Sequence, residues 1–206
     1  MSVGYDQAFW DERYRQHAHI WSGNPNPHLV AQAEDLRPGR ALDVGCGEGA
    51  DAVWLAQRGW QVDAIDVSEV ALNRAREHAG AQGDRVTFRR VDLMTERDLG
   101  DARYDLVSSQ YLHLPPDVRT AVIASLATAT ARGGTLLIVG HHVSDLQVVP
   151  RPNAPELFFT GAEIRAALVA DEWDVLIDTA APRTVPHPED GRTVTIHDNV
   201  FCAVRR

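Results

Sequence analysis

A glycine-rich turn between two short apolar runs constrains the fold of this chain more than any other feature. Residues 41–44 lead into Gly45-Cys46-Gly47-Glu48-Gly49, a helical apolar spacing follows, and residues 62–65 end in Asp66. Glycines at a strand-to-helix turn let the backbone approach a ligand and leave the helix N-terminus facing it. In such units an acid about 20 residues further on holds a ribose hydroxyl. The stretch therefore predicts a βαβ nucleotide-binding unit.

The glycine spacing alone is compatible with more than one ligand. Gly45-x-Gly47-x-x-Ala50 matches the dinucleotide pattern, whereas Gly45-x-Gly47-x-Gly49 matches a second type of cofactor. A tight turn that simply needs glycine is a third interpretation. The glycines do not decide among these interpretations, so the rest of the chain must.

Apolar runs alternate with helical periods along much of the chain, which is typical of a parallel sheet covered by helices. Two further strands are expected near the end, at residues 173–179 and 194–204, with a polar loop at 182–192 between them. Residues 143–159 show no clear period and are expected to be a functional or disordered segment. The first five strands are expected at residues 41–44, 62–65, 86–91, 104–108 and 135–139.

The length of 206 residues suits a single domain, 1–206. Within it we expect an N-terminal helical cap at 1–39, a ligand-binding core at 40–140, and a loop or lid, a last helix and a strand pair at 141–206. The cap contains a predicted helix with one aromatic face, which includes Trp10 and Tyr14. That helix could pack on the core, cover the ligand as a flap, or do both.

Composition excludes several classes of function. The net charge of −9 disfavours general binding to nucleic acid or anionic membranes. The chain has no lysine, which excludes Schiff-base chemistry and an ordinary P-loop kinase. Cys46 and Cys202 form no metal motif or disulfide framework, and no metal site is expected. Without a signal peptide or an apolar stretch of membrane length, a cytoplasmic location is expected.

Acidic residues end each of the first three expected strands, at Asp43, Asp66 and Asp92. The carboxyl ends of parallel strands form the ligand-binding edge of such a sheet. An acid just before the first glycine would repel a pyrophosphate, since like charges repel. The three acids would instead suit a cationic nucleoside without phosphates, such as a sulfonium that bears an amino acid.

Four ordered motifs resemble those of the class I S-adenosylmethionine-dependent methyltransferases: LDVGCGEG at 42–49, VDAIDVS at 62–68, VDL at 91–93 and YDLV at 104–107. A weaker likeness, through WDERY at 10–14 and the glycine turn, is to the small bacterial branch with tellurite-resistance and thiopurine-type methyltransferases. The resemblance implies an α/β fold: a Rossmann-like, doubly wound, mostly parallel seven-stranded sheet with a final antiparallel strand and helices on both faces.

The resemblance also implies S-adenosyl-L-methionine as the cofactor and assigns its contacts. Gly45, Gly47 and Gly49 would meet the methionine part, and the small Cys46 suits close approach there. Asp43 would bind the amino group and Asp66 the ribose hydroxyls. The remaining implied contacts are Val67, Asp92 and Leu93 at the adenine, Gln110 and Tyr111 near the sulfonium, and the aromatic faces of Trp10, Tyr14 and Tyr111 beside the positive charge.

The expected reaction is transfer of a methyl group to an O, N or S atom of a small-molecule acceptor by in-line displacement. A protonated acceptor needs a general base, and His113 and His141 follow expected strand ends, although a surface or structural role is common for each. The expected partner is a small molecule rather than nucleic acid or membrane, and the chain is expected to be a monomer or homodimer. An NAD(P)-dependent oxidoreductase and a non-catalytic S-adenosylmethionine-binding protein remain alternatives.

Overall fold

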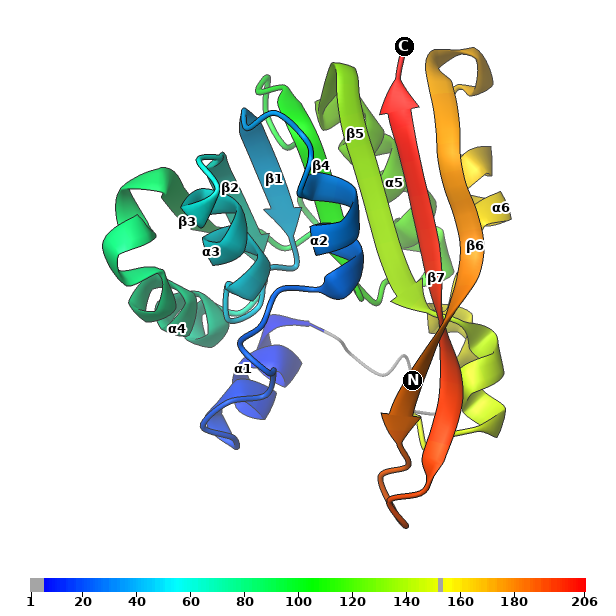
Figure 1. Ribbon diagram of the computed structural model, residues 1–206. Helices are drawn as coiled ribbons and strands as arrows, with labels where there is room; N and C mark the ends of the chain where they lie inside the picture. Colours follow the sequence, from blue (N-terminus) through cyan, green and yellow to red (C-terminus); the bar gives the residue numbers. More distant parts are fainter. Residues whose placement is uncertain (1–5, 152–153) are drawn as a thin grey trace.

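The centre of the molecule is a seven-stranded sheet with the order β3-β2-β1-β4-β5-β7-β6 (Figure 1). The computed structural model describes residues 6–151 and 154–206. All neighbouring strands are parallel except β7, which lies antiparallel between β5 and β6, so the predicted fold class is confirmed. The strands are β1 (Arg40–Val44), β2 (Gln61–Asp66), β3 (Val86–Arg90), β4 (Tyr104–Gln110), β5 (Thr130–His141), β6 (Trp173–Pro186) and β7 (Thr193–Arg205).

Helices cover both faces of the sheet because its central strands are apolar on both sides (Figure 1). On one face, α2 and α3 bury Leu29 and Leu55 against the sheet, with α4 packed beside α3. On the other face, α5 and α6 bury Leu126 and Ile164. The α-helices are α1 (Gln7–Arg15), α2 (Pro27–Ala33), α3 (Ala50–Gln57), α4 (Glu69–Ala79), α5 (Pro116–Ala129) and α6 (Gly161–Ala166).

Local capping explains where several helices begin. The Ser68 hydroxyl accepts a hydrogen bond from the Ala71 backbone N–H and starts α4 at the predicted residue. A capping box formed by Thr160 and Glu163 starts α6, also as predicted. The backbone N–H groups of Ser68 and Gly47 both donate to the Asp66 carboxylate, which holds the end of β2 next to the glycine turn.

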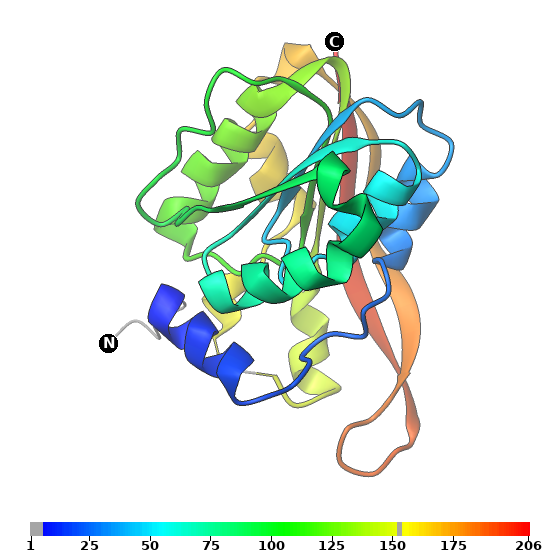
Figure 2. The same ribbon diagram turned by 90° about the vertical axis from the view of Figure 1, so that its left-hand side faces the viewer.

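The last two strands are longer than the sequence predicts. Residues 182–186 were expected in a polar loop, but they continue β6 as a two-stranded ribbon with β7. That prediction was wrong because β7 supplies backbone partners along the whole ribbon, and β6 is an edge strand, where proline is tolerated. Figures 1 and 2 show the ribbon projecting past the end of β5, beyond the ligand-binding edge of the sheet.

The segment 143–159 was expected to lack regular structure, yet it contains two short 3₁₀ helices, η2 (Val143–Gln147) and η3 (Pro155–Leu157). Residues 152–153 of this segment lie outside the described residues. Asp145 and Phe159 are buried and tie the segment to the end of β5 and to β7. Among the helices that the structure describes, none combines the length and apolar character needed to cross a bilayer.

Candidate active site

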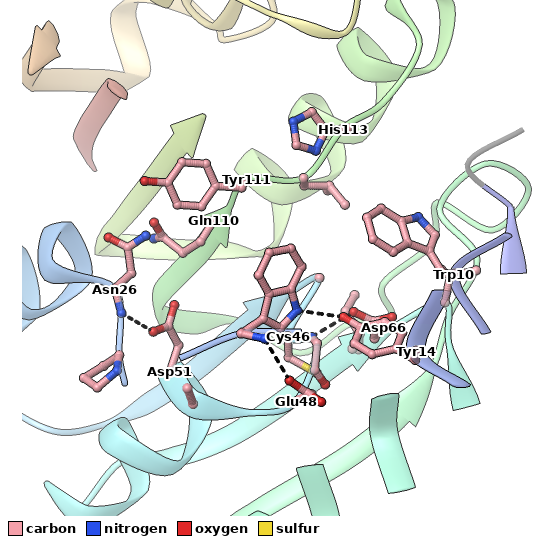
Figure 3. A pocket seen from close by; sticks show the side chains of 18 of the residues that line it. Trp10, Tyr14, Asn26, Cys46, Glu48, Asp51, Asp66, Gln110, Tyr111 and His113 are labelled. Atoms are coloured by element: carbon pink, nitrogen blue, oxygen red, sulfur yellow. Dashed lines mark hydrogen bonds between the residues drawn. The ribbon is translucent and has the colours of Figure 1, made fainter. Parts of the chain in front are cut away.

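A cavity of about 550 Å³ opens at the carboxyl ends of the parallel strands (Figure 3). Its volume falls within the range of about 300–1,000 Å³ that is typical of small-molecule sites. Most of the predicted site residues line it together, whereas two, Asp43 and Gly49, do not. The predicted residues that line the cavity are Trp10, Tyr14, Gly45, Cys46, Gly47, Asp66, Val67, Asp92, Leu93, Gln110, Tyr111, His113 and His141.

Two glycines of the turn have different tasks. Gly47 has φ +51°, and a Cβ there would lie 3.0 Å from the Tyr14 hydroxyl and 3.1 Å from Nε1 of Trp21. Gly49 has φ +82° and begins α3, and its Cβ would lie 2.9 Å from the Cβ of Ala75 on α4. Gly47 therefore keeps the cavity open to a ligand, and Gly49 permits the close packing of α3 on α4.

Four acids, Asp43, Glu48, Asp51 and Asp66, lie at or next to the glycine turn. Asp66 accepts hydrogen bonds from the backbone N–H of Gly47 at 2.9 Å and of Ser68 at 2.8 Å, and burial raises its pKa. Asp51, in the first turn of α3, accepts from the Asn26 backbone at 2.6 Å, and burial raises its pKa to about 6. The fourth acid, Glu48, accepts from the backbone of Ile20 and Trp21.

Asp43 lies behind the turn rather than in the cavity wall. Burial, together with the negative charges of Asp51 and Asp66, raises the pKa of Asp43 well above its usual value. One of its oxygens, Oδ2, has no hydrogen-bond partner within the described parts of the chain. A cationic ligand at the turn would stabilise the ionised form of this buried carboxyl.

The N-terminal segment covers the same end of the cavity. Nε1 of Trp21 donates to the Tyr14 hydroxyl at 3.0 Å, and the Arg74 guanidinium donates to the carbonyl oxygens of Tyr14 and His17 and to Glu48. Trp10 on α1 lines the cavity beside Tyr14 (Figure 3). The aromatic face of α1 therefore both packs on the core, through the buried Tyr14, and borders the cavity.

The wall at β3 and β4 carries Asp92 and Gln110. The Asp92 carboxylate accepts from the Met94 backbone at 2.9 Å, and Leu93 and Met94 lie beside it in the cavity wall. Nε2 of Gln110 donates to the Ser108 hydroxyl at 2.8 Å. The Oε1 of Gln110 is buried with no partner in the described residues, so this oxygen can accept from a ligand.

Tyr111, His113 and His141 form the opposite end, where Figure 3 shows Tyr111 and His113 across the cavity from Asp66. Tyr111 has φ +53°, a strained conformation for a residue with a large side chain. Its ring centroid lies 4.5 Å from that of His141, which in turn lies 5.7 Å from that of His113. Burial, with the nearby His141 and Arg151, lowers the pKa of His113 to about 4, so its ring is neutral near pH 7.

His141 is held between charged groups. Burial lowers its pKa, although the nearby Asp198 acts in the opposite direction. The guanidinium of Arg151 lies 3.2 Å from its Nε2 and 3.3 Å from its Nδ1, and Asp198 lies 3.8 Å from its Nδ1. A guanidinium can only donate hydrogen bonds, so its contacts with both ring nitrogens favour a neutral ring.

Sequence reasoning missed several residues of the cavity. Asp51 had a usable signal, because it follows the glycine turn by two residues in the first turn of a helix. Arg151 and Arg183 had none, since the first comes from the segment without periodicity and the second from the expected loop at 182–192. Residues missed at the cavity include Trp21, Asn26, Glu48, Asp51, Arg151 and Arg183.

Comparison with known proteins identifies a methyltransferase domain within the chain. Residues 41–134 match the model of a methyltransferase domain. The chain is 32% identical over 114 residues to the ribosomal RNA small subunit methyltransferase C of Alcanivorax borkumensis, which covers 51% of this chain and 33% of that protein. It is 29% identical over 123 residues to the 2-heptyl-1-hydroxyquinolin-4(1H)-one methyltransferase of Mycobacteroides abscessus, which covers 58% and 54%.

Residues 41–134 form a methyltransferase domain, and the relatives and the fold support a class I S-adenosylmethionine-dependent methyltransferase.

Solved structures agree with this family at the level of the fold. A structure from work on "Conversion of a Disulfide Bond into a Thioacetal Group during Echinomycin Biosynthesis" has a TM-score of 0.75 and 25% identity, covering 97% of this chain and 91% of that one. TehB from Haemophilus influenzae has a TM-score of 0.73 and 20% identity, covering 97% and 67%. The chain spans about a third to about half the length of the curated relatives described above.

The residues at the glycine turn fit the methyltransferase cofactor, S-adenosylmethionine. The acids Asp51 and Asp66 provide negative charge for its cationic groups, and the unpartnered buried oxygen of Asp43 can ionise beside a bound cation. A Cβ at Gly47 would narrow this part of the cavity. Within the described residues, no group of three or more metal-ligating side chains is found.

Proposed function

We propose that the chain transfers a methyl group from S-adenosylmethionine to an O, N or S atom of a small-molecule acceptor. The observation that carries this proposal is one continuous cavity with an acidic, glycine-lined end and an aromatic, histidine-lined end. Bound S-adenosylmethionine would supply the activated methyl group. The chain's own residues then have three tasks: to orient the two reactants, to exclude water and to receive a proton.

The acidic end supports binding of the donor. Asp66 has lone pairs free for two ribose hydroxyls even after it accepts its two backbone hydrogen bonds. Val67, Leu93 and Asp92 border the place proposed for the adenine, and Cys46 presents only a thiol, whose pKa is raised by burial. Trp10, Tyr14 and Tyr111 are proposed to place aromatic rings around the positive charge.

At the other end, His113 is the better candidate for a base. A hydrogen bond from its ring to the Tyr111 backbone leaves the second ring nitrogen as an acceptor of protons. The Nε2 of His141 instead lies against the donors of Arg151. We therefore assign proton acceptance to His113 and a positioning role, beside Tyr111 and Arg151, to His141.

Calorimetric titration with S-adenosylhomocysteine and with NAD tests the donor assignment. S-adenosylhomocysteine should bind, and tight binding of NAD alone would support the oxidoreductase alternative. A screen of thiols, phenols, amines and carboxylic acids, with released S-adenosylhomocysteine as the readout, tests turnover. A protein that binds the donor but turns over no acceptor in that screen would be the non-catalytic alternative.

One relative acts on ribosomal RNA by its name, which makes RNA a second candidate acceptor. The net charge of −9 opposes it, since RNA binding depends on positive surface. A filter-binding assay with short RNA at low salt would decide between them. We expect no binding there, and we expect light scattering to give the mass of a monomer or homodimer.

A further inference from the structure

The charges around the cavity are divided between its two ends. Acids line the end at the glycine turn, among them Glu48, Asp51 and Asp66. The guanidinium groups of Arg151 and Arg183 line the other end, next to Tyr111 and the histidines. A cationic ligand fits the first end, and this separation suggests that an anionic ligand fits the second.

The two arginines face the cavity, while their counterions lie behind them. Asp145 and Asp198 are fully buried and do not line the cavity. Asp145 accepts from Arg151 at 3.2 Å, and Asp198 accepts from Arg183 at 2.6 Å. This arrangement fixes both guanidinium groups and leaves donors, rather than acceptors, toward a ligand.

Arg183 has hydrogen-bond donors that no described residue uses. Its Nε donates to Asp198, and neither of its Nη atoms makes a hydrogen bond to any described residue. The two Nη atoms of one guanidinium form a planar fork that matches the two oxygens of a carboxylate. Nε of Arg151 is likewise buried without a partner in the described residues.

A role for Arg183 only as the counterion of Asp198 does not account for its position in the cavity wall. Asp198 already has His28 at 3.2 Å from Oδ2 and His141 at 3.8 Å from Oδ1, so it does not depend on Arg183 alone. The ribbon of β6 and β7 carries Arg183 past the end of β5 and into the cavity wall. A counterion for Asp198 alone would not need to line the cavity.

We propose that the methyl acceptor is a small organic carboxylate, bound end-on by the Arg183 fork with Arg151 beside it. This inference rests on the proposed function. Tyr111, Leu112 and Leu114 supply the apolar wall for the carbon skeleton of the acceptor. The bound carboxylate would also raise the low pKa of His113, since a nearby negative charge favours the protonated ring.

The proposed methyl transfer involves the donor, the acceptor and His113. A lone pair on an O, N or S atom of the acceptor forms the bond to the methyl carbon. The bond between that carbon and the donor sulfur breaks, and its electron pair stays on sulfur. A proton on the attacking atom passes to the ring nitrogen of His113 and then to solvent.

The first test compares acids with their neutral amides. Calorimetry on the protein loaded with S-adenosylhomocysteine would use 4-hydroxybenzoate and 4-hydroxybenzamide, then 4-hydroxyphenylacetate and its amide. We expect each acid to bind about tenfold or more tightly than its amide, the low end of a charge-assisted interaction. Equal or weaker binding of both acids would overturn the proposal.

Substitutions of Arg183 test whether this residue binds the carboxylate of the acceptor. Arg183→Gln should weaken binding of the acid about tenfold to a hundredfold and leave the amide unchanged, and Arg183→Lys should restore part of the loss. The matched control is Arg192→Gln, in the turn between β6 and β7, where the Arg192 side chain is 65% exposed and pairs with Asp190. Equal losses for acid and amide in Arg183→Gln would show a structural role instead.

The same titrations separate this proposal from the proposed function. If S-adenosylhomocysteine binds and the acids show no preference over the amides, only the carboxylate assignment fails. If S-adenosylhomocysteine does not bind to the wild-type protein, the methyltransferase function itself fails. Melting temperatures of the Arg183 variants show whether the ribbon remains folded.

Discussion

We expect Asp51 to make the affinity for the donor depend on pH. It lies in the first turn of α3, lines the cavity and has a pKa raised to about 6 by burial. A raised pKa means that the carboxyl of the free protein holds a proton below about pH 6 and is ionised above it. A cationic donor prefers the ionised form, so its affinity should rise as the pH increases through this range.

The size of the effect follows from the fraction of Asp51 that is ionised. With a pKa of about 6, that fraction is roughly one-eleventh at pH 5 and ten-elevenths at pH 7. If only the ionised form binds, the Kd for S-adenosylmethionine is about tenfold lower at pH 7 than at pH 5. Isothermal titration calorimetry at pH 5, 6 and 7 measures this ratio directly.

Asp51→Asn should remove the inflection near pH 6 and weaken binding at pH 7. Since Asp51 also raises the pKa of Asp43, any remaining pH dependence should move to lower pH. Asp117→Asn is the matched control, because Asp117 is also in the first turn of a helix but is exposed and outside the cavity. A flat wild-type profile, or an unchanged profile in Asp51→Asn, would refute the reasoning.

Three further substitutions test the donor end. Asp66→Ala should raise the Kd for S-adenosylhomocysteine about tenfold to 150-fold through loss of charge-assisted hydrogen bonds, and an unchanged Kd in a folded variant would reject the ribose assignment. Gly49→Ala should lower the free energy of unfolding by about 1–3 kcal/mol in thermal melts, and more than Gly133→Ala, whose Cβ would meet nothing within 4 Å. Trp21→Phe removes the hydrogen bond to Tyr14 and should speed dissociation of S-adenosylhomocysteine in stopped-flow experiments, an effect that Trp60→Phe in the buried core should not share.

The elements that the sequence predicted well are those with short-range signals. The Ser68 cap and the apolar period that follows placed α4 at its observed bounds. β6 was cut short because prolines at 182 and 186 and the turn signal at 190–191 suggested a loop. Only the pairing with β7, a contact between strands that propensity does not encode, shows that the chain stays extended to Pro186.

The same distinction explains which parts of the site were predictable. Asp66 and Asp92 follow parallel strands, and the geometry of such sheets places strand ends together, so sequence order was sufficient to group them. Arg151 and Arg183 meet at the cavity only because η2 and the ribbon both pack at the end of β5, through Asp145 and Asp198. No spacing in the sequence encodes that meeting.

The cavity residues inside the matched methyltransferase domain differ in kind from those outside it. The methyltransferase model matches residues 41–134, which contain the glycine turn and all four acids of the donor end. His141, Arg151 and Arg183, together with Asn26 and Trp21, line the cavity from outside that match. Similarity to relatives therefore supports the donor more than the acceptor, because both arginines proposed to bind the acceptor lie outside the matched domain. The chemistry of these side chains is therefore the best guide to the acceptor. The paired titrations of acid and amide test it directly, because they measure whether the protein prefers a carboxylate to its neutral analogue.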